Sequence, residues 1–135
     1  MNSKIAKLKV CDWTLLSLTV IMLASSIQLE VTGGKDPLWV WAHIVTGTLF
    51  FTGILWHCYL HFGMHDWIRR LRKRYIWISL FFLLTFMSAA IATGHWLTVA
   101  THSMPGAVHG KIGFVFIAIV TGHIIHRIRF YKQKQ

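Results

Sequence analysis

The sequence predicts an all-α membrane protein, a four-helix bundle whose helices run alternately up and down, and three observations lead to this prediction. Of the 135 residues, 55% are hydrophobic and only 13% are charged, which is too little charge to cover a soluble domain of this size. Four long segments carry almost no charged side chain, and the basic residues gather beside them. We therefore expect one transmembrane domain over residues 1–135.

The four apolar segments predict transmembrane helices over about residues 12–31, 38–62, 75–100 and 107–128. Asp36 and Pro37 predict where the second helix begins, because an aspartate cap is often followed by proline at the first helical position. Lys111, near the start of the fourth segment, can extend its long side chain to the lipid headgroups. All connections are short, so consecutive helices are expected to pack as antiparallel neighbours.

The basic residues predict the orientation of the bundle. All but two of the 14 lysines and arginines, Lys35 and Lys111, lie before the first segment, between the second and third, or after the fourth. By the positive-inside rule, both termini are expected in the cytoplasm. The net charge of +10 is thus explained by topology and lipid contact, and no nucleic-acid partner is expected. The two cysteines form no CxxC or CxxCH motif, which excludes a disulfide scaffold and covalent haem attachment.

The nine histidines include two pairs with the same spacing. His57 follows His43 by 14 residues, and His123 follows His109 by the same interval. Such an interval is about four helical turns, so the members of each pair point in similar directions and lie about 21 Å apart along the axis. The second and fourth helices run in the same direction. We therefore expect His43 and His109 at one depth near the outer face, and His57 and His123 at one depth near the inner face.

This arrangement predicts two haem b groups bound without covalent links. Neutral imidazole is the usual axial ligand of such a haem. His43 and His109 are the predicted ligands of the outer iron, and His57 and His123 those of the inner iron. Two imidazoles fill both axial positions, which favours electron transfer over oxygen chemistry. Gly47 and Gly113 each follow the first histidine by four residues and are candidate contacts of a porphyrin edge, with close helix packing as the alternative.

The repeated H-x13-H and H-x3-G patterns and the four-segment layout, over about residues 11–129, resemble the small bacterial di-haem cytochromes b. The flavinylation-associated cytochrome group is the most similar. The resemblance implies a multi-pass protein of the bacterial inner membrane that serves as the electron-transfer subunit of a quinone-linked oxidoreductase. With little chain outside the membrane, it is expected to exchange electrons with a separate redox protein, and a quinone is a candidate ligand.

Two alternatives stay open at this point. Histidines in membrane helices also suit a transition-metal or proton conductor, which predicts a carboxylate near the membrane midplane, whereas all four acids are expected at span ends or in loops. The chain is alternatively a haem-bearing anchor subunit of a larger redox complex. Four further histidines have no assigned role, although the first two are alternative inner ligands or contacts of the haem propionates: His61, His126, His95 and His102.

Overall fold

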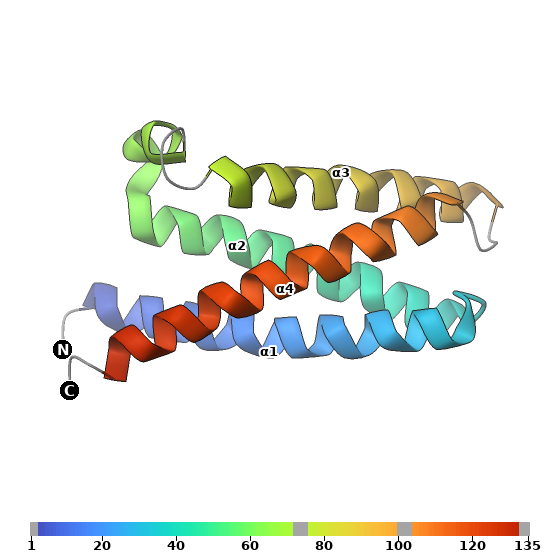
Figure 1. Cartoon of the computed structure of the whole chain (residues 1–135), viewed down its shortest axis with the longest axis horizontal. Helices are drawn as coiled ribbons and strands as arrows, with labels where there is room; N and C mark the ends of the chain where they lie inside the picture. Colours follow the sequence, from blue (N-terminus) through green and yellow to red (C-terminus); the bar gives the residue numbers. More distant parts are fainter. Residues whose placement is uncertain (1–2, 72–75, 100–103, 133–135) are drawn as a thin grey trace.

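The computed structural model describes the backbone of residues 3–71, 76–99 and 104–132, and the side chains of residues 6–63, 76–99 and 104–126. Four helices make up this part of the chain: α1 (Ser3–Thr32), α2 (Pro37–Leu71), α3 (Ile76–Val99) and α4 (Met104–Lys132). They run alternately in opposite directions (Figure 1). Each contains a segment long and apolar enough to cross a membrane. The predicted all-α, four-helix, up-and-down architecture is confirmed.

The bundle has two ends, which we name by what lies there. At the basic end α1 and α3 begin and α2 and α4 end, and most of the lysines and arginines lie there in sequence. At the turn end, α1 is connected to α2 through Gly33 and Gly34. Both glycines have positive φ, and the amide of Gly34 donates to the carbonyl of Leu29 over 2.9 Å. This is the hydrogen bond of a Schellman cap, which reverses the chain at the end of a helix.

The beginning of α2 is as predicted. The Asp36 carboxylate accepts a hydrogen bond from the amide of Leu38 at 2.9 Å, and Pro37 is the first helical residue. The other boundaries differ in part from the predicted spans. The helix α1 begins at Ser3, ahead of the predicted span, so Asp12 lies within the helix and near its basic end. The helix α2 continues to Leu71 beyond a break at Gly63, where φ is 65° and ψ is 172°.

The helices form two hairpins. The pairs α1 with α2 and α3 with α4 pack closely along their lengths, whereas the two hairpins approach each other at few places. In the described part of the chain, α2 and α4 make no close backbone approach to each other, nor do α1 and α3. Figure 1 shows α4 crossing in front of the other helices, with α1 and α3 on either side of it. The helices α2 and α4 therefore face each other diagonally across the centre.

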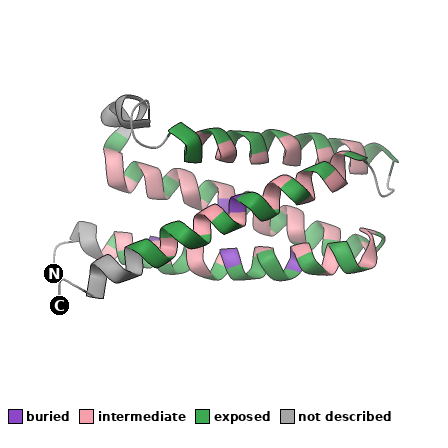
Figure 2. Ribbon diagram, viewed as in Figure 1, coloured by how far each residue is buried: buried purple, intermediate pink, exposed green. Residues whose placement is uncertain are grey.

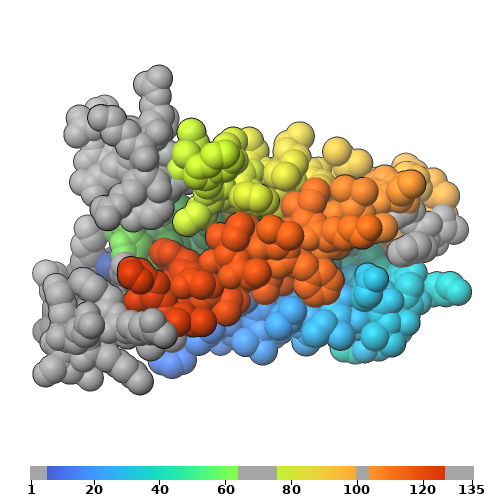
Figure 3. Space-filling model, viewed as in Figure 1, coloured from blue at the N-terminus to red at the C-terminus, as the bar shows by residue number. Residues whose placement is uncertain are grey.

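Few side chains are buried, as Figure 2 shows by the scarcity of purple. Among the described residues, only Cys11, Phe50 and Phe116 are buried and apolar. The outer surfaces of the helices are rich in exposed Leu, Ile, Val, Phe and Trp, as lipid contact requires. In the space-filling view, α4 fills the face toward the viewer between α1 and α3 (Figure 3). What lies at the centre of the bundle is mainly the side chains that α2 and α4 direct toward each other.

Candidate metal centres

Three pairs of aromatic rings meet across the diagonal between α2 and α4. We call the histidine pair near the turn end the turn-end pair, the histidine pair near the basic end the basic-end pair, and the phenylalanines between them the phenylalanine rung. The same spacing, H-x6-F-x6-H, places them on both helices. The ring centroids are 6.1 Å apart for His43 and His109, 6.4 Å for Phe50 and Phe116, and 6.5 Å for His57 and His123. The structure thus brings together both histidine pairs that the sequence predicts.

In the turn-end pair, His43 contacts a serine of α1. The Oγ of Ser25 lies 2.9 Å from Nδ1 of His43 and 3.0 Å from the carbonyl oxygen of Met22. A hydroxyl has one hydrogen, and a carbonyl only accepts. Both contacts are hydrogen bonds only if Ser25 donates to Met22 and accepts from an Nδ1–H of His43. This tautomer leaves a lone pair on Nε2, the atom that would be available to a metal.

The other half of the turn-end pair repeats this arrangement on the second hairpin. Ser88 of α3 donates to the carbonyl of Thr85 at 2.9 Å, and its Oγ lies 3.1 Å from Nδ1 of His109. The same hydrogen count assigns Nδ1–H and a free Nε2 lone pair to His109. Ser25 is buried, and Ser88 and both histidines are half-buried. Two imidazoles in the ligating tautomer therefore face the centre of the bundle from opposite helices.

In the basic-end pair, His57 contacts a carboxylate instead of a hydroxyl. The Oδ1 of Asp12 in α1 lies 2.9 Å from Nδ1 of His57, and both side chains are about three-quarters buried, with exposed fractions of 24% and 21%. The alignment departs from a straight hydrogen bond, so we describe the contact as a carboxylate–imidazole pair. A carboxylate beside one ring nitrogen favours the proton at that nitrogen and leaves the other for a metal.

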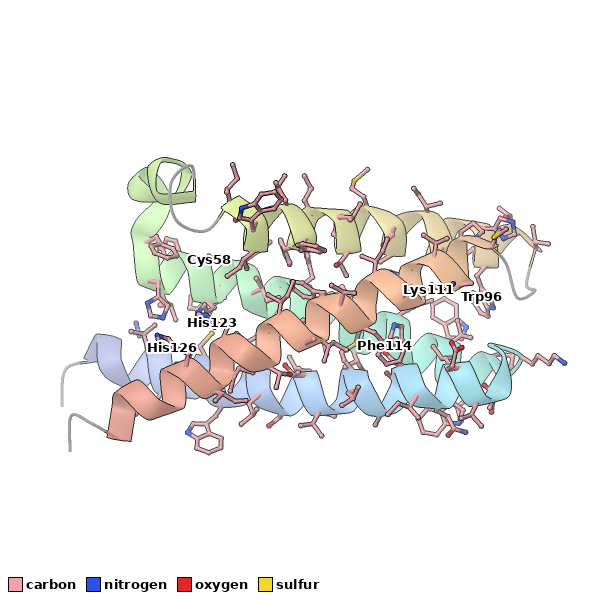
Figure 4. The ribbon with its side chains drawn as sticks, viewed as in Figure 1. Cys58, Trp96, Lys111, Phe114, His123 and His126 are labelled. Atoms are coloured by element: carbon pink, nitrogen blue, oxygen red, sulfur yellow. The ribbon has the colours of Figure 1, made fainter. Side chains whose placement is uncertain are left out.

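The basic-end pair is more open than the turn-end pair. His123 is exposed, and so is His126, one turn further along α4. Figure 4 shows both side chains projecting from α4 near Cys58 of α2. His61 lies beside His57, with ring centroids 4.5 Å apart. One ligand atom from each of Asp12, His57 and His61 falls within 4.8 Å of the others, which is a second possible metal-binding group.

The separation within each histidine pair fits two imidazoles on one iron. Bonds of about 2 Å from opposite sides of one metal ion place the two ring centroids about 6 Å apart. Both pairs have this separation. Direct ring contact gives similar distances, as the phenylalanine rung demonstrates. What distinguishes His43, His109 and His57 is the polar partner at Nδ1, which orients the ring and leaves Nε2 available.

The glycines of α2 and α4 have different surroundings. A Cβ on Gly47 would lie 3.7 Å from Met22, and one on Gly53 would lie 2.9 Å from Leu15, so these two glycines of α2 face α1. These contacts support the helix-packing interpretation of Gly47, and its role as a porphyrin contact stays a prediction. A Cβ on Gly113 or Gly122 would meet no described atom within 4 Å. Gly113 therefore stays the better candidate for approach by a flat ligand.

The remaining predicted residues lie toward the turn end. His95 of α3 is half-buried, and no described group hydrogen-bonds its Nδ1. Its neighbour Trp96 packs edge-to-face on Trp41, with centroids 5.6 Å apart. Lys111 of α4 is exposed and, like Trp96, lies near the turn end in Figure 4. His102 lies outside the described residues.

Sequence reasoning missed the residues that support the histidines. Ser25 and Ser88 gave no signal, because a hydroxyl in an apolar helix usually donates to its own backbone and has no fixed partner. Asp12 was expected at a span end, and nothing in the sequence paired it with His57. The phenylalanine rung did have a signal, since Phe50 and Phe116 stand midway between the histidines in both helices. That shared spacing predicts a ring contact at the level between the two pairs.

Comparison of the chain with protein-family models, curated proteins and solved structures returned no match. The likeness to the small di-haem cytochromes b therefore rests on the residues of this chain alone, and membership of that group stays a prediction.

Proposed function

We propose that the protein is a membrane-embedded cytochrome b that binds two haem b groups and passes electrons across the bilayer. The observation that supports this most strongly is the pair of cross-bundle histidine contacts, at 6.1 and 6.5 Å between centroids, on helices whose backbones stay apart. A direct helix interface would need no such matched pairs. The hydrogen bonds from both turn-end imidazoles to serines add support, because they hold Nε2 in the ligating form.

In this proposal His43 and His109 bind the turn-end iron, and His57 and His123 bind the basic-end iron. Each bound haem would supply a one-electron couple at its iron. Two imidazoles would hold each haem, which would leave no ligand site for oxygen on the iron. The apolar helices exclude water, and the phenylalanine rung lies between the two pairs. These features suit a protein that carries electrons and leaves substrate chemistry to a partner.

The proposal includes an orientation and partners. By the positive-inside rule the basic end faces the cytoplasm of a bacterial inner membrane. Electrons would be exchanged between the quinone pool and a separate redox protein, and oxidation of a quinol would also release protons. A half-buried imidazole such as His95 near the turn end is the kind of group that accepts them.

The first test is a reduced-minus-oxidised spectrum with haem quantification on the purified full-length protein. We expect the spectrum of low-spin haem b, two haems per chain and no change on addition of cyanide. Colourless protein, expressed with an adequate haem supply, would contradict the proposal. A spectrum that shifts with cyanide would show an open axial position and contradict the bis-histidine ligand sets.

A second candidate function is transition-metal binding by the group Asp12, His57 and His61. The grouping of one carboxylate and two imidazoles favours it, because these side chains are common ligands of transition metals. His61 belongs only to this site, and His123 only to the haem pair. Under the haem proposal His123→Leu removes one haem and His61→Leu removes none. Under the metal proposal His61→Leu abolishes Zn²⁺ or Ni²⁺ binding by the full chain, and His123→Leu leaves it unchanged.

A further inference from the structure

His57 of the basic-end pair contacts a carboxylate. Asp12 lies 2.9 Å from Nδ1 of His57. At the turn end, Nδ1 of each histidine contacts a neutral serine hydroxyl. A carboxylate in an apolar membrane helix is costly, and such groups usually mark a functional contact. The two candidate centres have the same histidine ligands. They differ in that the group in contact with Nδ1 is a charged carboxylate at His57 and a neutral hydroxyl at His43 and His109.

We propose that Asp12 is a positioning residue that lowers the reduction potential of the basic-end haem below that of the turn-end haem. This inference rests on the proposed di-haem function. Asp12 holds the imidazole of His57 with its Nδ1 toward α1, which leaves Nε2 to the metal. It also brings a negative charge next to the ligand, which no group in contact with Nδ1 of His43 or His109 does.

Two physical effects of Asp12 both lower the reduction potential of the basic-end haem. The carboxylate draws the Nδ1 proton toward itself, so His57 donates more electron density through Nε2 and stabilises the oxidised iron. The negative charge also favours the iron state with the higher positive charge, and this attraction is strong where water is excluded. Both effects oppose uptake of one electron at the basic-end haem. A serine hydroxyl provides neither to the same degree, because it carries no net charge.

The sequence of α3 explains why the second hairpin has no counterpart of Asp12. The helix α3 contains no aspartate or glutamate, whereas α1 contains Asp12 and Glu30. Glu30 lies near the turn-end terminus of α1, beside the glycine turn. The two hairpins are therefore alike in the serines that contact their turn-end histidines, and α3 has no acid to match Asp12. An electron shared between the two haems then resides preferentially at the turn end.

The test is a spectroscopic redox titration of the purified full-length holoprotein with Asp12→Asn. Asparagine has nearly the shape of aspartate and keeps an oxygen beside Nδ1, so this variant removes the charge and retains the contact. We expect both haems to be kept and the lower midpoint potential to rise. A change of about tenfold in the reduction equilibrium of that haem corresponds to about 59 mV for a one-electron couple. The higher midpoint potential should stay in place.

A second set of variants shows which haem each midpoint potential belongs to. It also tests the role of Asp12 if Asp12→Asn does not retain its haem. His109→Leu retains only the basic-end haem and shows which midpoint belongs to it. Asp12→Glu keeps the charge, and Asp12→Ser replaces the carboxylate by the hydroxyl that the turn end uses. We expect the basic-end potential to stay low with Glu and to rise with Ser. Ser25→Ala is the matched control at the other end and should leave the basic-end potential unchanged.

The outcomes separate this inference from the proposed function. If the wild-type protein binds no haem, the proposed function fails before any potential is measured. If both haems are present and Asp12→Asn moves neither potential, or moves both equally, the inference about Asp12 is wrong while the cytochrome assignment stands. If Asp12→Asn loses the basic-end haem, a rise in potential with Asp12→Glu would overturn the inference, and an unchanged low potential would support it.

Discussion

At the turn end of the bundle both histidines contact serine hydroxyls, whereas at the basic end His57 contacts the carboxylate of Asp12 and His123 is exposed. The two ends are built from the same repeat on α2 and α4, so the candidate ligands are equivalent in type. The difference comes from α1 and α3, whose side chains contact Nδ1 of these histidines. In the proposed cytochrome, one pair of helices would thus position the two haems while the other pair sets how the two haems differ.

The largest effect is expected when one histidine of either pair is removed. We expect His43→Leu and His109→Leu each to remove the turn-end haem, and His57→Leu and His123→Leu each to remove the basic-end haem, because both imidazoles are needed to hold a non-covalent haem. Haem per purified chain, measured with protein concentration, should fall from two to one in every case. Joint removal of both histidines of one pair should cost no more than removal of one.

His95→Leu is the matched control for these variants. It replaces a half-buried histidine that belongs to neither pair, so we expect it to keep both haems. If His95→Leu lost as much haem as His43→Leu, loss of membrane histidines in general, rather than loss of ligands, would account for the results.

The next largest effect is expected between the two ends, at the phenylalanine rung. Phe50 and Phe116 are 8% and 5% exposed and contact each other at the centre of the bundle. Phe116→Ala should lower the free energy of unfolding by about 3 kcal/mol, as truncation of a buried phenylalanine commonly does. Denaturation in mixed detergent micelles measures this. Phe50→Ala should have a similar effect, and the double variant should cost less than the sum because the two rings share one contact.

A smaller effect is expected from the serines, and it should be confined to the turn end. Ser25→Ala or Ser88→Ala removes the hydroxyl that holds Nδ1, which for a group behind a metal ligand weakens binding by about tenfold or more. Competition of the loaded protein with a haem-scavenging apoprotein measures the release of each haem. Ser17→Ala, on an exposed hydroxyl bonded only to the Trp13 carbonyl, is the control. Equal release from both ends in Ser25→Ala would contradict a local role.

The smallest effect concerns the glycines. Gly53→Ala would place its Cβ 2.9 Å from the end of the Leu15 side chain, which can shift, so we expect a loss of about 1 kcal/mol from mild overpacking. Gly122→Ala meets nothing within 4 Å and should leave stability unchanged or slightly raised, since alanine favours helix over glycine. The same unfolding assay compares them. A larger loss for Gly122→Ala than for Gly53→Ala would contradict this. It would mean that α4 is packed more tightly at Gly122 than α2 is packed against α1 at Gly53.

The sequence predicted those features that depend on local periodicity. Apolar length gave the four helices, Asp36 and Pro37 gave the start of α2, and an interval of about four turns gave the shared direction of His43 and His57. Features that depend on neighbouring helices could not be predicted from the sequence. The partner of a histidine on α2 is set by the rotation of α1, which a single sequence does not fix. Ser25 and Asp12 were therefore found only in the structure.

The division into two hairpins has a consequence for how the protein is made. The contacts of α1 with α2 involve only the first half of the chain, so this hairpin can enter the membrane and fold before α3 and α4 are synthesised. The contacts of α3 with α4 likewise involve only the second half. Contacts between the hairpins, of α1 with α4 and of α2 with α3, need both halves and can form only after the second half is made. The order of synthesis therefore separates the formation of the hairpins from their assembly.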